Sequence, residues 1–295
     1  MRVTDSMIHM GVQDNIQRAM QRLNKHYNQL TTGKMINRPS DDPVGLILGM
    51  RLKKGITENE QYKENVNAAL ALLNGSDYAL DEMTKALQRL EELAVQGANG
   101  TLDEISLNAI ANEVEELRNH LYQIANTKQE NTYIFGGEKT TTPPYELDTT
   151  TTPPGVNWQG SLNPLKAEVG PGIVMEVTVP GDRIFGTFFD ELAQFIDNLR
   201  NGNFRDISAN DITNIQNRLD EVLQIRGEIG AKVNRLEKNV DRMELMDINF
   251  RELLSKIEDT DYAEVTMNLM MQESVYQAAL ATSARIMRST LVNYI

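Results

Sequence analysis

Apolar side chains recur at every third or fourth position over most of this chain, the spacing that gathers them on one face of an α-helix. Four such runs cover residues 16–30, 80–94, 107–124 and 212–257. In the last run, twelve of the fourteen positions on the stripe are apolar, and the exceptions are Arg226 and Asp247. A 3.5-residue repeat kept over this length is typical of a coiled-coil-like seam. The pattern therefore predicts a mainly α fold, an elongated antiparallel helical bundle.

Turn-forming residues divide these helices. The sequence Asn-Arg-Pro-Ser-Asp-Asp-Pro at 37–43 predicts a break that offers Ser and Asp caps and a proline for the next first turn. Asn-Gly-Ser at 74–76 predicts another break, and Gly136 with Gly137 is expected to cap the end of the third run. From there to about residue 186 the chain holds seven of its nine prolines and a β-branched segment at 173–179. These features predict a small β-rich insertion.

The chain ends differ from the rest in their apolar pattern. From Ser274 onward the only charged residues are Arg285 and Arg288, and small or apolar residues cover every face of the predicted helix. Such a helix belongs in a core. We expect it to pair with the N-terminal helix as a coiled coil. We expect neighbouring copies of the chain to cover the apolar surface that this pairing leaves exposed. The predicted assembly interface comprises Met7, Met10, Ile16, Met20, Leu23, Leu30, Tyr276, Ala279, Leu280, Ile286 and Leu291.

Five segments follow from these boundaries. They are an N-terminal assembly helix (1–40), the first half of the helical bundle (41–137), the β-rich outer insertion (138–187), the second half of the bundle (188–257) and a C-terminal assembly helix (258–295).

Charge narrows the functional classes. The net charge of −13 argues against a nucleic-acid-binding protein, because phosphate contacts need a basic face. The acidity is concentrated in the middle of the chain, since residues 1–36 carry +3 and residues 264–295 carry no net charge. No stretch approaches the 18 consecutive apolar residues of a membrane-spanning helix, and the N-terminus lacks the apolar segment of a cleaved signal peptide. These rules alone predict a cytoplasmic protein.

Residues for catalysis or metal binding are sparse. The chain has no cysteine, and its three histidines, His9, His26 and His120, are far apart and lack a metal-binding spacing. Asp41 and Asp42 precede an apolar helical run, where a pair of aspartates is more often a helix cap than a metal site. No nucleophile, base and orienting group occur together. We therefore predict no enzyme activity, no cofactor and no metal.

Three motifs resemble one family. They are Leu-Thr-Thr-Gly-Lys-Met-Ile-Asn-Arg-Pro-Ser-Asp-Asp-Pro at 30–43, Asn-Thr-Tyr-Ile-Phe-Gly-Gly at 131–137, and Ser-Lys-Ile-Glu-Asp-Thr-Asp-Tyr-Ala-Glu at 255–264 followed by Gln-Glu-Ser-Val-Tyr-Gln-Ala-Ala-Leu at 272–280. Together they resemble the terminal signatures of flagellins and flagellar hook-associated proteins. The resemblance covers roughly 1–137 and 188–295 and leaves the insertion outside. Its motif and cap positions in this chain are Asn37, Arg38, Asp41, Asp42, Asp259 and Asp261.

The resemblance implies a structural component of the bacterial flagellum. Junction members of the family form a ring of copies that connects the hook, through hook-associated protein 1, to the flagellin filament. Members leave the cell through the flagellar type III export apparatus without a cleaved signal, and an export chaperone holds the C-terminal helix. The resemblance thus implies an extracellular location in the flagellum and replaces the cytoplasmic expectation.

Three alternatives stay open at this stage: a flagellin-type filament subunit, a cytoplasmic coiled-coil adaptor, and an enzyme housed in the β insertion.

For the junction role we expect the chain ends to become ordered only when the subunit assembles. The ends, about 1–40 and 255–295, cannot bury enough apolar surface in one copy to offset chain entropy, so we expect them to be mobile in the monomer.

Overall fold

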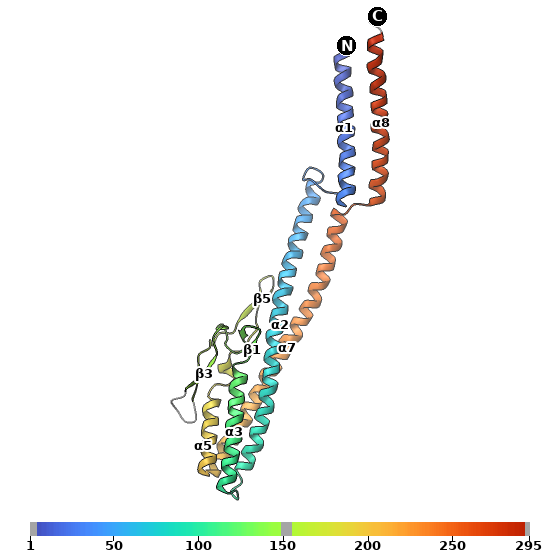
Figure 1. The fold of residues 1–295 in the computed structure, drawn as a ribbon. Coiled ribbons are helices and arrows are strands. Elements are labelled where there is room, and N and C mark those ends of the chain that lie inside the picture. The colour runs from blue at the N-terminus through green and yellow to red at the C-terminus, as the bar shows by residue number, and fades with distance from the viewer. Residues whose placement is uncertain (1–4, 149–154, 293–295) are drawn as a thin grey trace. The chain divides into compact units, whose positions relative to one another are not determined.

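The computed structural model describes residues 5–148 and 155–292, and most of them are helical (Figure 1). The helices are α1 (Asp5–Thr32), α2 (Pro43–Gly97), α3 (Glu104–Ala125), α4 (Gly181–Ile184), α5 (Phe188–Asn201), α6 (Phe204–Asp206) and, after a π-helical turn η1 (Ile207–Asp211), α7 (Ile212–Glu258) and α8 (Tyr262–Val292). The strands are β1 (Lys128–Gln129), β2 (Thr132–Tyr133), β3 (Tyr145–Asp148), β4 (Gly155–Trp158), β5 (Lys166–Gly170) and β6 (Ile173–Glu176). The prediction of a mainly α fold with paired terminal helices and a small β-rich insertion is confirmed.

The chain divides into two compact units, and the boundary between them falls within α2 and within α7. Unit 1 consists of Met1–Glu58 and Leu245–Ile295, and unit 2 is Asn59–Glu244.

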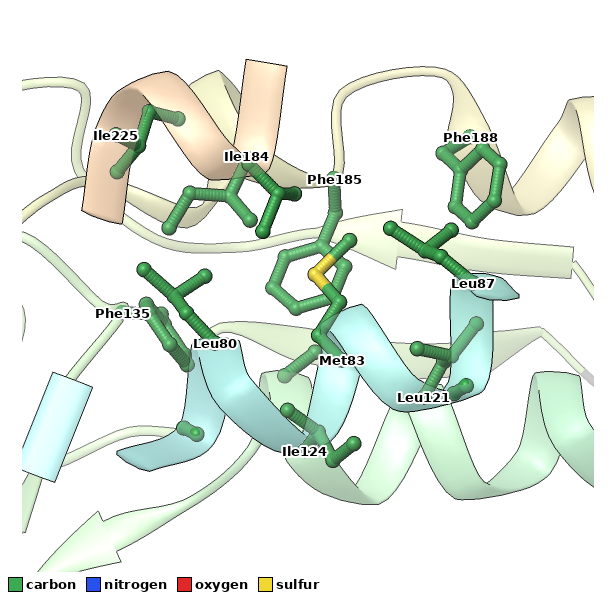
Figure 2. Packing of buried hydrophobic residues seen from close by; sticks show 14 of the residues in the cluster. Leu80, Met83, Leu87, Leu121, Ile124, Phe135, Ile184, Phe185, Phe188 and Ile225 are labelled. Atoms are coloured by element: carbon green, nitrogen blue, oxygen red, sulfur yellow. The ribbon is translucent and has the colours of Figure 1, made fainter. Parts of the chain in front are cut away.

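Unit 2 contains the hydrophobic core. Leucine, isoleucine, methionine and phenylalanine side chains from α2, α3, α5 and α7 interdigitate with Ile184 of α4 and with Phe135 and Phe185 from the connecting segments (Figure 2). Each fully buried side chain of this size stabilises the folded state by about 1.5–3 kcal/mol. Arg226 interrupts the apolar stripe of α7 because it forms ion pairs with Asp77 (3.1 Å) and Asp81 (3.0 Å) of α2.

The insertion consists of short antiparallel pairs. β1 pairs with β2, β3 with β4, and β5 with β6. The β3–β4 pair is fixed to the helical core by Tyr145, whose ring lies 5.0 Å from that of Trp158 and 5.5 Å from that of Phe185. The strand predicted at 173–179 is shorter, because β6 ends at Glu176 and the Val177 N–H bonds instead to the Leu165 carbonyl (2.9 Å).

The predicted break at 74–76 is wrong. α2 continues through it, because packing outweighs the low helix propensity of the local sequence. Leu73 and Leu80 are fully buried on either side of the expected break, and the Ser76 hydroxyl bonds to the Leu72 carbonyl (2.8 Å) within the helix. Gly75 serves close packing instead, since an added Cβ would lie 2.9 Å from the amide oxygen of Gln129.

The expected helix cap at Gly136 and Gly137 is also wrong. α3 already ends at Ala125, and the Asn126 N–H bonds to the last carbonyls of that helix. Gly137 has φ +65°, and a Cβ there would collide with the carbonyl of Ser161 and lie 2.6 Å from that of Asn163. This glycine therefore permits a tight backbone approach within the insertion.

Candidate assembly site

The candidate site lies in unit 1, where α1 and α8 run antiparallel and side by side (Figure 1). Several of the predicted interface residues are only half-buried by this pairing: Ile16, Leu23, Leu30, Tyr276 and Ala279. Others remain exposed: Met7, Met10, Met20 and Leu280. The side chains of the predicted residues Ile286 and Leu291 lie outside the described ones.

Apolar side chains are distributed very differently in the two units. Of the 45 buried apolar residues described, only Ala19, Ile36, Ile56 and Val265 belong to unit 1. Of the 27 large apolar residues described as exposed, 19 belong to unit 1. A single copy therefore leaves most of the apolar surface of this unit in water, and such surfaces mark interaction sites.

A paired joint connects the terminal helices to α2 and α7. The segment after α1 and the segment after α7 form a short antiparallel bridge at Lys34 and Asp259. The Met35 N–H donates to the Glu258 carbonyl (2.7 Å), and the Thr260 N–H donates to the Gly33 carbonyl (3.0 Å). Gly33 has φ +69° and an added Cβ would lie 2.6 Å from the Tyr262 hydroxyl, so this turn requires glycine.

Glu258 is the electrostatic centre of the joint. Its carboxylate is almost fully buried and forms ion pairs with Lys34 (3.2 Å) and Lys53 (2.5 Å). Burial alone would raise the pKa of Glu258, but the two ammonium groups outweigh it and hold the pKa below its ordinary value. Gly49 leaves room for this carboxylate, since an added Cβ would lie 2.9 Å from its Oε1 atom. The pairs connect three segments: the turn after α1, the first part of α2 and the end of α7.

Two aspartates of the family motifs, Asp42 and Asp261, cap the N-termini of α2 and α8 at the joint. Asp42 Oδ1 accepts the N–H groups of Val44 and Gly45 at the start of α2 (3.0 Å each). Asp261 Oδ1 does the same for α8, accepting the N–H groups of Ala263 (2.8 Å) and Glu264 (3.3 Å). Each cap satisfies N–H groups that the first helical turn leaves without partners.

Asp41 closes the turn between α1 and α2. Its Oδ2 atom accepts the N–H groups of Asn37 (3.3 Å) and Arg38 (3.0 Å), and its carboxylate pairs with Lys25 of α1 (3.2 Å). Burial opposes ionisation, but these donors together lower the pKa of Asp41. The Asn37 amide donates to the Lys34 carbonyl (2.9 Å).

The structure brings together the six motif residues in one joint, while the apolar interface residues extend along α1 and α8 away from it. Sequence reasoning missed Glu258, Lys53 and Gln29, whose amide donates to the Met35 carbonyl (2.9 Å). The sequence offered one signal: Glu258 directly follows the apolar seam position Ile257, and a carboxylate that packing buries there needs a cationic partner.

The described part of the chain offers neither a metal-binding cluster nor a membrane-spanning helix. Residues 5–148 and 155–292 contain no group of three His, Cys, Asp or Glu side chains arranged to hold a metal ion. None of the helices described is both long enough and apolar enough to cross a membrane.

Comparison with known proteins defines the class. The model of the bacterial flagellin N-terminal helical region matches residues 3–140, and that of the flagellin C-terminal helical region matches residues 212–295. Together the two matches span most of the chain, so the chain belongs to the flagellin family. The matched regions include α1, the joint, α7 and α8, and they leave out β3 to β6.

Within this family, hook-associated protein 3 is similar over nearly the whole length. The protein of that name from Escherichia coli strain K12 is 26% identical over 95% of this chain and 95% of its own length. Hook-associated protein 3 of Salmonella typhimurium strain LT2 is 25% identical over 96% of each. Flagellin of Bacillus subtilis strain 168 is 26% identical over 88% of each. The prediction of a structural flagellar protein of the hook-associated kind is confirmed.

Solved structures show the same fold. A flagellar hook-associated protein from Vibrio parahaemolyticus matches with a TM-score of 0.67 at 19% identity, over 74% of this chain and all of that one. Hook-associated protein 3 from Legionella pneumophila matches with a TM-score of 0.61 at 17% identity, over 69% of this chain and 98% of that one.

Proposed function

We propose that this chain is a subunit of the junction between the flagellar hook and the flagellin filament, and that its terminal helices drive its assembly there. The observation that carries the proposal is the apolar surface of unit 1, which holds 19 of the 27 exposed large apolar residues described. The nearly full-length similarity to hook-associated protein 3 supports the junction rather than the filament as its place.

Assembly gains its free energy by covering that surface. Burying one large apolar side chain contributes about 1.5–3 kcal/mol, so a dozen positions on α1 and α8 contribute substantially to docking against neighbouring subunits. Segments 1–40 and 258–295 are the assembly helices in this proposal, segments 41–137 and 188–257 form the bundle, and the insertion 138–187 faces outward. Neighbouring copies in a ring, hook-associated protein 1 on the hook side and flagellin on the filament side are the partners.

The same apolar surface must be protected while the chain travels to the flagellum. A chain whose ends expose this much apolar surface needs protection before assembly, and an export chaperone that holds the C-terminal helix provides it. Export through the flagellar type III apparatus then places the chain outside the cell.

Amide hydrogen exchange tests the proposal. The purified full chain is compared with the same chain in isolated hook–filament junctions. We expect amides of α1 and α8 to exchange quickly in the monomer and slowly in the junction, while α3 and α5 are protected in both and serve as the internal control. Absence of the chain from junctions would contradict the junction role. Protection of α1 and α8 in the monomer would instead contradict assembly-coupled ordering and favour a self-contained adaptor.

Polymerisation of the purified chain distinguishes a filament subunit from a junction subunit. A flagellin-type subunit polymerises alone into long filaments, and the similarity to Bacillus subtilis flagellin makes that comparison necessary. For a junction subunit we expect no filaments by electron microscopy at any concentration at which flagellin itself polymerises.

A further inference from the structure

Methionine is distributed unevenly between the two units. Nine of the methionine side chains described are exposed, and all nine belong to unit 1. The three described in unit 2, Met83, Met175 and Met243, are buried, with exposed fractions of 0, 7 and 3%. In unit 2 methionine is thus a core residue, whereas in unit 1 its side chain lies on the surface of the single copy.

Six of the exposed methionines lie on the two proposed assembly helices. Met270 and Met271 follow Met267 by three and four residues, so the three side chains share one face of α8. They are exposed to 62, 55 and 67% respectively, whereas Val265 and Tyr276 on the opposite face are buried and half-buried. Together with three exposed methionines of α1 they form the methionine surface: Met7, Met10, Met20, Met267, Met270 and Met271.

Exposure opens a methionine side chain to oxidation. Hydrogen peroxide transfers one oxygen atom to the thioether sulfur: an S–O bond forms, the O–O bond breaks, and the second oxygen leaves as water. The sulfur loses two electrons and the peroxide gains them. The product, methionine sulfoxide, is polar where the thioether is apolar. Because the chain has no cysteine, methionine is its only sulfur-containing target for peroxide.

The methionine surface also has a simpler explanation. Flexible thioether side chains pack adaptably, so methionine suits a surface that has to fit several partners. Adaptable packing alone requires only that the side chains be apolar and flexible, and it makes no use of the reactivity of sulfur. Leucine has nearly the same volume and no reactive sulfur, so substitution by leucine separates the two explanations.

We propose that the methionine surface is an oxidation site that controls incorporation of the subunit into the junction. In the free subunit its six side chains are open to peroxide. Assembly of an oxidised subunit would have to bury their sulfoxides, and a buried polar group without a hydrogen-bond partner is unfavourable. Assembly of a reduced subunit covers the thioethers and protects them. The inference rests on the proposed junction function and adds that the free subunit is the oxidant-sensitive form.

Peptide mass spectrometry after peroxide treatment tests which methionines are open. The free full-length chain and isolated junctions receive the same dose. We expect sulfoxide at the methionine surface to form about tenfold faster in the free chain than in junctions. The buried Met83, Met175 and Met243 should stay mostly reduced in both and serve as the internal control. Equal rates in free chain and junctions, or buried methionines that oxidise as fast as the surface ones, would overturn the proposal.

Incorporation of the oxidised chain tests the consequence. Purified full-length chain is oxidised, freed of peroxide and offered for assembly into junctions. We expect incorporation to fall about tenfold, because the sulfoxides oppose burial. Reduction of the oxidised chain by methionine sulfoxide reductases A and B, one for each sulfoxide epimer, should restore incorporation. Oxidised chain that incorporates as well as untreated chain, or a loss that reduction does not reverse, would contradict an oxidation site.

Leucine variants locate the site. The resistant variant combines six substitutions: Met7→Leu, Met10→Leu, Met20→Leu, Met267→Leu, Met270→Leu and Met271→Leu. Peroxide treatment should leave its incorporation unchanged. The control variant changes three methionines exposed in unit 1 outside α1 and α8, and it should lose incorporation after peroxide as the wild type does: Met35→Leu, Met50→Leu and Met246→Leu. Resistance in the control variant, or equal sensitivity of the six-leucine variant and the wild type, would show that the methionine surface is not the site.

Untreated wild-type chain is measured in parallel. Its absence from junctions would contradict the junction role itself. Its presence, together with unchanged incorporation after oxidation, would contradict only the oxidation site.

Discussion

At the scale of single residues, Glu258 determines how the joint responds to pH. Its carboxylate bonds to Lys34 and Lys53, and these partners hold its pKa below the ordinary value of 4.5. A carboxylate whose pKa is lower in the folded than in the unfolded state stabilises the fold fully above its ordinary pKa. That stabilisation is lost as the pH falls through the lowered folded value. The joint should therefore loosen in acid, below about pH 4.5, and not at neutral pH.

Glu258→Gln removes the charge and keeps the shape. We expect it to weaken the joint by about 1 kcal/mol at pH 7, because the two lysines are half exposed and water offsets part of the loss. In isolated junctions, the amides of Met35 and Thr260, which bond across the joint, should then exchange about fivefold faster. Glu252→Gln is the control, since Glu252 forms an exposed pair with Lys256 away from the joint. Equal effects of the two substitutions, or an unchanged pH dependence in Glu258→Gln, would contradict this assignment.

At the scale of elements, periodicity predicted the helices and tertiary packing decided their ends. The run at 107–124 became α3 (Glu104–Ala125), and the run at 212–257 became α7 (Ile212–Glu258), since a regular apolar stripe is visible in the sequence itself. The continuity of α2 was not visible there, because it depends on buried neighbours such as Leu73 and Leu80. The joint was only partly predictable: capping is local in sequence, whereas Lys34 meets Glu258 across 224 positions.

Truncating a buried side chain in the unit 2 core should leave a cavity and lower the free energy of unfolding. Leu87 of α2 is fully buried next to Phe188 and Leu121 (Figure 2). Leu87→Ala should destabilise the full chain by about 2–5 kcal/mol, measured as a lower midpoint of thermal unfolding by circular dichroism. Leu223→Ala on α7 makes the same chemical change at a side chain that is 48% exposed, and we expect a loss below about 1 kcal/mol. Comparable losses at the two sites would mean that unit 2 is not packed as described.

At the scale of the whole molecule, unit 2 holds the core that stabilises the fold, and unit 1 carries the surface that we propose for assembly. Unit 2 buries nearly all of the described core, so we expect its stability not to depend on other copies, whereas unit 1 leaves 19 large apolar side chains exposed. A substitution on the exposed faces of α1 or α8 should therefore affect incorporation without affecting folding. A substitution that blocks incorporation but leaves folding unchanged would therefore test the proposed function directly.

Leu280→Asp places a charge on α8 at a side chain that is 42% exposed in the single copy. In the monomer the carboxylate stays in water, so the thermal unfolding midpoint should change by less than 2 °C, as expected for a change of about 0.5 kcal/mol or less. In the assembled junction the same carboxylate would be buried without a partner, at a cost of several kcal/mol, and incorporation should fall at least a hundredfold. Leu147→Asp, at an exposed position of similar accessibility on β3 of the insertion, should incorporate normally. Incorporation is measured by quantitative immunoblot of isolated hook–filament junctions, together with swimming. If Leu280→Asp enters junctions as well as Leu147→Asp does, α8 is not buried on assembly, and another surface must hold the subunit in place.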